Sequence, residues 1–182
     1  MSTWPSSVDH AVSPLAQALS AHQQRIATAE SCTGGLVAAA FTAQSGSSQW
    51  FERGYISYSN SAKQEDLGVH SETLERYGAV SEETAMEMAI GVLEMAAAAD
   101  LAVSTTGIAG PTGATAGKPV GMVCFGFARR TDEGIVAHAH TQLFDGDRQA
   151  VRHQAVLYVI KQALDLVSPH LVPPVATDHG MT

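Results

Sequence analysis

The chain of 182 residues is 45% hydrophobic and 15% charged, a composition that excludes a disordered protein and allows one domain with a sizeable core. Its formal net charge of −8 argues against a general nucleic-acid binder, because phosphate binding depends on Lys and Arg. A small anionic ligand is compatible with that charge, since one local pocket can be positive on an acidic protein.

Sequence signals for export, membrane insertion and disulfide pairing are missing. The first ten residues lack the basic start and apolar run of a signal peptide, and no apolar stretch reaches the length of a membrane span. The two cysteines, Cys32 and Cys124, form neither a disulfide framework nor a CxxC metal pattern. We therefore expect a cytoplasmic protein with no membrane or nucleic-acid partner.

Hydrophobic periodicity predicts helices and strands that alternate along the chain. In chain order, the patterns predict a helix at 11–23, a strand at 25–29, a helix at 33–42, a strand at 54–59, short helices at 61–67 and 71–77, a helix at 85–96, strands at 101–105, 120–129 and 135–144, and a helix at 147–167. The turn at 131–134 between the last two strands predicts a hairpin.

This alternation predicts an α/β fold, a three-layer α/β/α sandwich around a mixed, mostly parallel sheet of about five strands. The hairpin puts at least one antiparallel strand in that sheet. We expect a single domain at 11–168, a flexible N-terminus at 1–10 and a flexible, proline-containing tail at 169–182. Apolar faces on the helix at 85–96 and on the last helix favour a homo-oligomer, in the first place a dimer.

Three stretches rich in polar residues, 30–35, 58–63 and 105–113, each begin where a predicted strand ends. Ligands of open α/β sheets bind at the carboxyl ends of the strands. If the three strands are parallel neighbours, the stretches meet at one edge of the sheet and can form one site.

The first stretch has the sequence ESCTGG. As an isolated pattern it is typical of a helix start capped by Ser31 or Thr33. The functional interpretation makes Ser31 a nucleophile at a helix N-terminus, where free N–H groups stabilise an oxyanion. Cys32 is the rival nucleophile, although no histidine lies in these stretches to activate it. Glu30 could be a general base or a partner of the loop backbone. The second role is favoured, because a carboxylate beside a lysine base would keep that lysine charged.

The second stretch supplies Lys63, one of only three lysines in the chain. A buried lysine can lose its proton and act as the general base for Ser31. Tyr58 is expected to orient Lys63 or to relay the proton. The alternative is a solvated lysine beside a core tyrosine, which is the usual role of an isolated lysine.

The third stretch, TTGIAGPTG, combines small residues with hydroxyl donors. Its glycines allow backbone N–H groups to approach a ligand closely. It lacks the GKS or GKT ending of a Walker loop, so it is a weak phosphate signal by itself. The alternative is a tight Gly/Pro turn without a ligand.

Five motifs occur together in this chain: ESCTGG, FERGYISYSNSAK, YGAVSEETAMEMAIGVL, TGIAGPTG with KPVG, and GDRQAVR. In this order and spacing, over residues 16–166, they closely resemble the CinA C-terminal domain family, whose stand-alone bacterial members are nicotinamide-nucleotide amidases. The resemblance implies hydrolysis of the carboxamide of nicotinamide mononucleotide to nicotinate mononucleotide and ammonia, with no metal and no cofactor.

The resemblance also implies roles for individual residues. Ser31 matches the nucleophile and Lys63 the base, with Tyr58 beside them. The substrate-binding positions that it implies are Glu30, Thr33, Gly34, Gly35, Asn60, Thr105, Thr106, Gly107, Ile108, Ala109, Gly110, Arg148 and Arg152. The loop at 107–111 matches the segment next to the ribose phosphate, and the two arginines are assigned to the phosphate or to structure. Ser31 is expected to form an acyl-enzyme while N–H groups around Thr33 and Gly34 hold the oxyanion.

Two other functions stay open at this point. One is a non-catalytic nucleotide-binding or regulatory module, and the other is a Ser–Lys amidase for a different carboxamide. A binding module does not need an uncharged lysine against Ser31, so the environment of Lys63 separates the first alternative from an enzyme.

Overall fold

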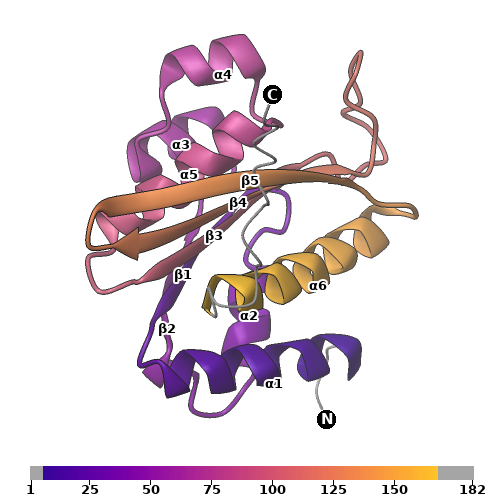
Figure 1. Ribbon diagram of the computed structural model, residues 1–182. Coiled ribbons are helices and arrows are strands. Elements are labelled where there is room, and N and C mark those ends of the chain that lie inside the picture. The colour runs from indigo at the N-terminus through magenta and orange to yellow at the C-terminus, as the bar shows by residue number, and fades with distance from the viewer. Residues whose placement is uncertain (1–5, 168–182) are drawn as a thin grey trace, which may run out of the picture.

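A computed structural model describes residues 6–167 (Figure 1), so the predicted tail at 169–182 lies outside the described residues. A sheet of five strands lies between two layers of helices. The helices are α1 (Ser6–Ala21), α2 (Leu36–Thr42), α3 (Asn60–Leu67), α4 (Ser71–Tyr77), α5 (Glu82–Met95) and α6 (Arg148–Val167), with a short 3-10 turn, η1 (Ser47–Gln49). The strands are β1 (Ile26–Glu30), β2 (Phe51–Ile56), β3 (Leu101–Gly107), β4 (Met122–Thr131) and β5 (Gly134–Leu143).

The strands are arranged in the order β2-β1-β3-β4-β5. Strand β1 is parallel to both of its neighbours, β2 and β3, whereas β4 is antiparallel to β3 and to β5. Helices α3, α4 and α5 cover the upper face of the sheet in Figure 1, and α1, α2 and α6 cover the lower face. The predicted three-layer α/β/α fold with a mixed sheet is confirmed.

Each face of the sheet carries its own apolar core. The lower core joins α1, α2 and α6 to the sheet, with Phe41 and Phe125 among its fully buried members. The upper core lies under α5, which packs closely on β4 at Gly126. A Cβ atom at Gly126 would lie 2.0 Å from the Ala85 carbonyl oxygen, so only glycine permits this approach.

Helix α1 begins at Ser6, five residues before the predicted start at residue 11. The prediction of loose residues at 6–10 is therefore wrong. Val8 is 2% exposed and continues the apolar stripe of Val12, Leu15 and Leu19, so burial of this stripe extends the helix toward the N-terminus.

Several other predicted boundaries differ by a few residues, and two of these differences change how the site is built. Helix α2 begins at Leu36 rather than at residue 33, so residues 31–35 form a turn. Strand β2 ends at Ile56 rather than at residue 59, because the chain leaves the sheet to enter α3. The hairpin, in contrast, is confirmed: Thr131 of β4 pairs with Gly134 of β5 across a two-residue turn.

Among residues 6–167, no helix is long and apolar enough to cross a membrane.

Candidate active site

The three polar stretches meet at one edge of the sheet. Glu30, the last residue of β1, pairs with Ile56 of β2 on one side and with Thr105 of β3 on the other. Because all three strands are parallel, the segments that follow them leave the sheet in the same direction. The convergence predicted for these stretches is confirmed by direct contacts between them.

The central contact joins Ser31 to Lys63. The Lys63 Nζ lies 3.0 Å from the Ser31 Oγ, 2.9 Å from the Ser57 carbonyl oxygen and 3.0 Å from the Tyr58 carbonyl oxygen. A neutral amine has two N–H donors and one lone pair. Two carbonyl groups take the donors, so the lone pair can accept the proton of the Ser31 hydroxyl.

Burial makes the neutral form of Lys63 accessible. The side chain is 1% exposed, and this loss of hydration lowers its pKa from the ordinary 10.5 to about 8. Helix α3 holds Lys63 in place, and its start is fixed by the Ser59 hydroxyl, which accepts from the Ala62 N–H at 3.0 Å. The alternative of a solvated surface lysine is wrong.

Glu30 organises the turn that carries Ser31. One carboxylate oxygen accepts from the Thr33 hydroxyl at 2.7 Å and from the N–H groups of Gly35 and Val37 at 3.0 Å each. The other oxygen accepts from the Ala38 N–H at 2.8 Å. The buried carboxylate thus binds the free N–H groups at the start of α2, and neither Ser31 nor Thr33 caps this helix.

The hydroxyl of Thr33 extends this network to the next strand, since it lies 2.6 Å from the Thr105 hydroxyl. The Ser31 N–H donates to the Thr105 carbonyl at 2.9 Å, which fixes the turn to β3 a second time. Both threonines are buried, so their hydroxyls support the turn. Their predicted contact with substrate is not visible in this arrangement.

Gly34 and Gly35 are not free oxyanion donors. The Gly34 N–H donates to the Ser31 carbonyl at 3.1 Å, and the Gly35 N–H donates to Glu30. The expectation that the N–H of Gly34 holds an oxyanion is therefore wrong. Among residues 6–167, the N–H groups of Cys32 and Thr33 donate to no other group of the chain, so these two are the candidate oxyanion donors of the turn.

Cys32 points away from the Ser31–Lys63 contact and belongs to the lower core. Its side chain is 6% exposed, and burial raises the pKa of the thiol to about 12. A thiol that keeps its proton is a poor nucleophile. The structure therefore favours Ser31 over Cys32.

Tyr58 contributes through its backbone rather than through its ring. Its carbonyl accepts from Lys63 and lies 3.4 Å from the Ser31 Oγ. The phenol is on a side chain that is 60% exposed, and its oxygen accepts from Arg148 at 3.3 Å. The expected proton relay through the phenol has no support in this geometry, whereas the expected orientation of Lys63 is provided by the carbonyl.

Arg148, at the start of α6, joins two segments of the site. Besides Tyr58 it donates to the Gly110 carbonyl at 2.9 Å, so it connects the loop after β2 to the loop after β3. A pocket of about 570 Å³ opens here, lined by Ala109, Pro111, Val120, Gly146, Asp147, Arg148 and Gln149. Ala109, Pro111 and Arg148 were predicted to belong to the site. The other four lining residues were not, because the pocket forms where two segments distant in sequence meet, the β3–β4 connection and the start of α6.

The remaining residues of the third stretch are held by backbone bonds. The Thr106 hydroxyl donates to the Ala79 carbonyl at 2.7 Å, and the Ile108 N–H donates to the Met122 carbonyl at 2.8 Å. Gly107 faces β4 so closely that a Cβ atom would lie 2.7 Å from the Met122 carbonyl oxygen. Asn60 is exposed at the start of α3. The substrate contacts expected of these four residues stay predictions.

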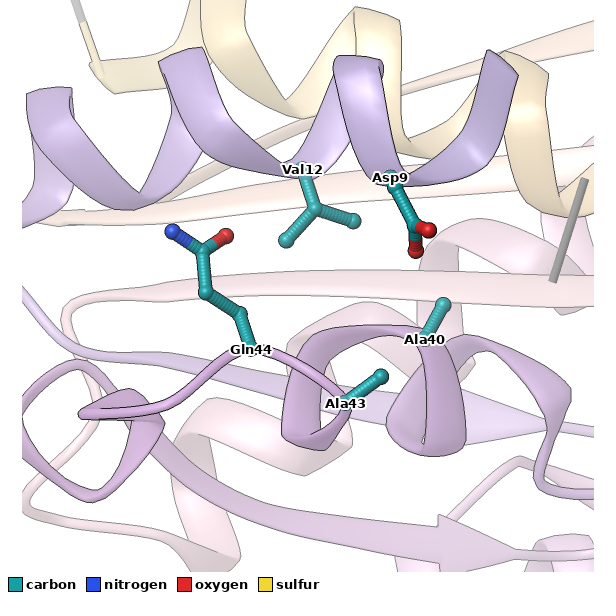
Figure 2. Close-up of a pocket in the computed structure, with 5 residues that line it drawn as sticks. All are labelled: Asp9, Val12, Ala40, Ala43 and Gln44. Carbon is teal, nitrogen blue, oxygen red and sulfur yellow. The ribbon is translucent and has the colours of Figure 1, made fainter. Parts of the chain in front are cut away.

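A second pocket lies elsewhere on the molecule. Figure 2 shows Asp9 and Val12 of α1 facing Ala40, Ala43 and Gln44. The pocket that these residues line has a volume of about 210 Å³. It shares no lining residue with the Ser31–Lys63 region. Within residues 6–167, no group of three or more His, Cys, Asp or Glu side chains is placed to hold a metal ion.

The sequence pattern of the CinA C-terminal domain matches residues 9–167. This chain belongs to the CinA C-terminal domain family. The "Nicotinamide-nucleotide amidohydrolase PncC" of Enterobacter agglomerans is 55% identical over 147 residues, which are 81% of this chain and 87% of that protein. The protein of the same name from Escherichia coli (strain K12) is 54% identical over 80% of this chain and 86% of its own length.

Solved structures of CinA proteins share the fold. A competence/damage inducible protein, CihA, from Agrobacterium tumefaciens is 38% identical, with a TM-score of 0.84 over 91% of this chain and 99% of that chain. A CinA superfamily protein from Klebsiella pneumoniae is 36% identical, with a TM-score of 0.83 over 89% and 98%. The five-stranded CinA architecture is therefore common to these chains.

Proposed function

We propose that this CinA-family chain hydrolyses the carboxamide of nicotinamide mononucleotide to nicotinate mononucleotide and ammonia. The activity is the one that the printed names of its relatives at 54–55% identity describe. The observation that carries the proposal is the buried contact of 3.0 Å between the Lys63 Nζ and the Ser31 Oγ. A nucleophile next to a desolvated general base can carry out acyl transfer without a metal.

In the proposed reaction neutral Lys63 takes the Ser31 proton as the Ser31 Oγ attacks the carboxamide carbon. The carbonyl electrons move to its oxygen, which the Thr33 N–H binds as an oxyanion. When the intermediate collapses, the C–N bond breaks and Lys63 returns the proton to the departing ammonia. Water, activated by Lys63, then attacks the ester, which releases nicotinate mononucleotide and restores Ser31.

The pocket at Arg148 is the proposed position of the nucleotide part. Arg148 is exposed, cationic and adjacent to the loop at 107–111, so it suits the phosphate of the substrate. We further propose a cytoplasmic location, which rests on the cysteine content. The expected homodimer loses its argument, because the apolar faces of α5 and α6 are buried in the two cores of this chain.

Ammonia release tests the proposal directly. The chain is incubated with nicotinamide mononucleotide, free nicotinamide and NAD, and Ser31→Ala is the matched control. Release from the mononucleotide alone supports the proposal. Release from another carboxamide only would make the chain a different Ser–Lys amidase. Binding of the mononucleotide without release from any substrate would indicate a binding module.

A further inference from the structure

Arg152 of α6 holds the turn that carries the nucleophile. Its Nε donates to the Cys32 carbonyl at 3.1 Å and its Nη2 donates to the Thr33 carbonyl at 3.0 Å. These are the carbonyl groups of the two residues that follow Ser31. No carboxylate forms an ion pair with Arg152 among residues 6–167, so its positive charge is applied to these two peptide groups.

Arg152 and Lys63 approach the turn from opposite sides of the sheet. Arg152 comes from α6 in the lower layer of Figure 1, and Lys63 comes from α3 in the upper layer. The C=O and N–H of a trans peptide point in opposite directions. Because the Cys32 carbonyl accepts from Arg152 of α6, the Thr33 N–H of the same peptide points away from α6.

We propose that Arg152 is a positioning residue that sets and polarises the oxyanion donor, the Thr33 N–H. This inference rests on the proposed function of the site. A planar guanidinium presents two parallel donors to two successive carbonyls, and an ammonium group cannot reproduce that fork. The nearby positive charge also favours the negative charge that develops on the substrate oxygen.

This role differs from the phosphate contact that sequence reasoning considered for Arg152. Two of its nitrogen atoms are already bound to backbone carbonyls, and it does not line the 570 Å³ pocket. Arg148, four residues earlier on the same helix, is exposed and does line that pocket. The two arginines therefore have different roles. Arg148 lines the pocket proposed for the substrate phosphate, and Arg152 binds the turn that carries Ser31.

Kinetics of Arg152→Lys and Arg152→Met separate the two roles, with nicotinamide mononucleotide and its phosphate-free riboside as substrates. Lys161→Met, an exposed position on the same helix, is the matched control. We expect kcat to fall about 10- to 100-fold for both substrates, with KM changed less than about threefold, because the interaction acts in the transition state. A rise in KM for the mononucleotide alone, with kcat retained, would assign Arg152 to the phosphate and overturn the inference.

A second readout does not depend on the natural substrate. A fluorophosphonate probe that modifies Ser31 also develops negative charge at an oxygen, so both Arg152 variants should be labelled more slowly than wild type and Lys161→Met should not. If wild type is labelled but does not hydrolyse the mononucleotide, the proposed function is wrong. The role of Arg152 is then judged from the labelling rates of its variants. Equal labelling of all variants, or loss of cooperative unfolding in both Arg152 variants, would overturn it.

Discussion

The Lys63 amine lies 3.0 Å from the Ser31 hydroxyl, and its two other hydrogen-bond partners are the carbonyl groups of Ser57 and Tyr58. Within the described part of the chain, residues 6–167, no carboxylate forms an ion pair with Lys63. The carboxylate of Glu30 is bound instead by N–H groups of α2 and by Thr33. The lysine is thus desolvated without a counter-charge that would hold its proton.

The first prediction concerns the pH dependence of activity. Lys63 acts as a base only when uncharged, and burial lowers its pKa to about 8. We expect kcat/KM to rise with pH, to reach a plateau above about pH 8, and to be about 100-fold lower at pH 6. Initial rates from pH 5.5 to 9.5 provide the measurement. A flat profile between pH 6 and 9 would contradict the role of Lys63.

A second prediction concerns stability and uses the same pKa with its sign worked out. Between about pH 8 and 10.5 the unfolded chain retains a proton on Lys63 that the folded chain has lost. The free energy of unfolding from this group therefore increases with pH across that window. Urea denaturation of wild type and Lys63→Met at pH 7.5 and 10 should show a stability difference that shifts in favour of wild type at the higher pH, because the contribution of the buried Cys32 thiol is common to both proteins. An identical pH dependence in the two proteins would disprove the lowered pKa.

A third prediction separates the two adjacent nucleophile candidates. Ser31→Ala should reduce ammonia release at least about 1000-fold, because the attacking oxygen is lost. Cys32→Ala should keep kcat near the wild-type value and lower the free energy of unfolding by about 1 kcal/mol, since it removes a buried sulfur from the lower core. Assays and thermal melts of both variants check this. An inactive but folded Cys32→Ala would favour the thiol.

A fourth prediction tests Glu30 as the organiser of the turn. In Glu30→Gln the amide nitrogen replaces one of two acceptor oxygens, so it faces N–H donors at the start of α2. We expect a loss of about 2 kcal/mol in the free energy of unfolding. Urea denaturation measures it, with Glu65→Gln on the exposed surface of α3 as the control. An equal, small effect of both substitutions would be inconsistent with a supporting carboxylate.

A fifth prediction uses two glycines with positive φ. Gly35 has φ +98° and Gly46 has φ +85°, but only at Gly35 would a Cβ atom meet a neighbour, the Ile56 Cδ1 at 2.9 Å. Gly46→Ala should cost about 1 kcal/mol from backbone strain alone, and Gly35→Ala slightly more, because the exposed end of the Ile56 side chain must also shift. Chemical denaturation compares the pair. The explanation fails if Gly46→Ala is the more destabilising change.

The fold was largely predictable from local patterns. The apolar stripe of α6 and the hairpin turn each depend on residues within a few positions of one another. The start of α2 was not predictable in this way. The N–H groups at the start of α2 are bound by Glu30, which lies five residues before the N-cap residue Gly35. The Glu30 carboxylate reaches these N–H groups only because the turn between them folds back toward the end of β1.

The sequence by itself determined the alternation of helices and strands and the three polar stretches at strand ends, because periodicity and turn chemistry are local properties. The tertiary structure alone decided what those stretches do. Burial lowered the pKa of Lys63 and so made its neutral form accessible. The packing of α6 placed Arg152 where it donates to two backbone carbonyl groups. Desolvation and backbone contacts between distant segments are properties of the folded assembly of layers, so no single stretch of residues encodes them.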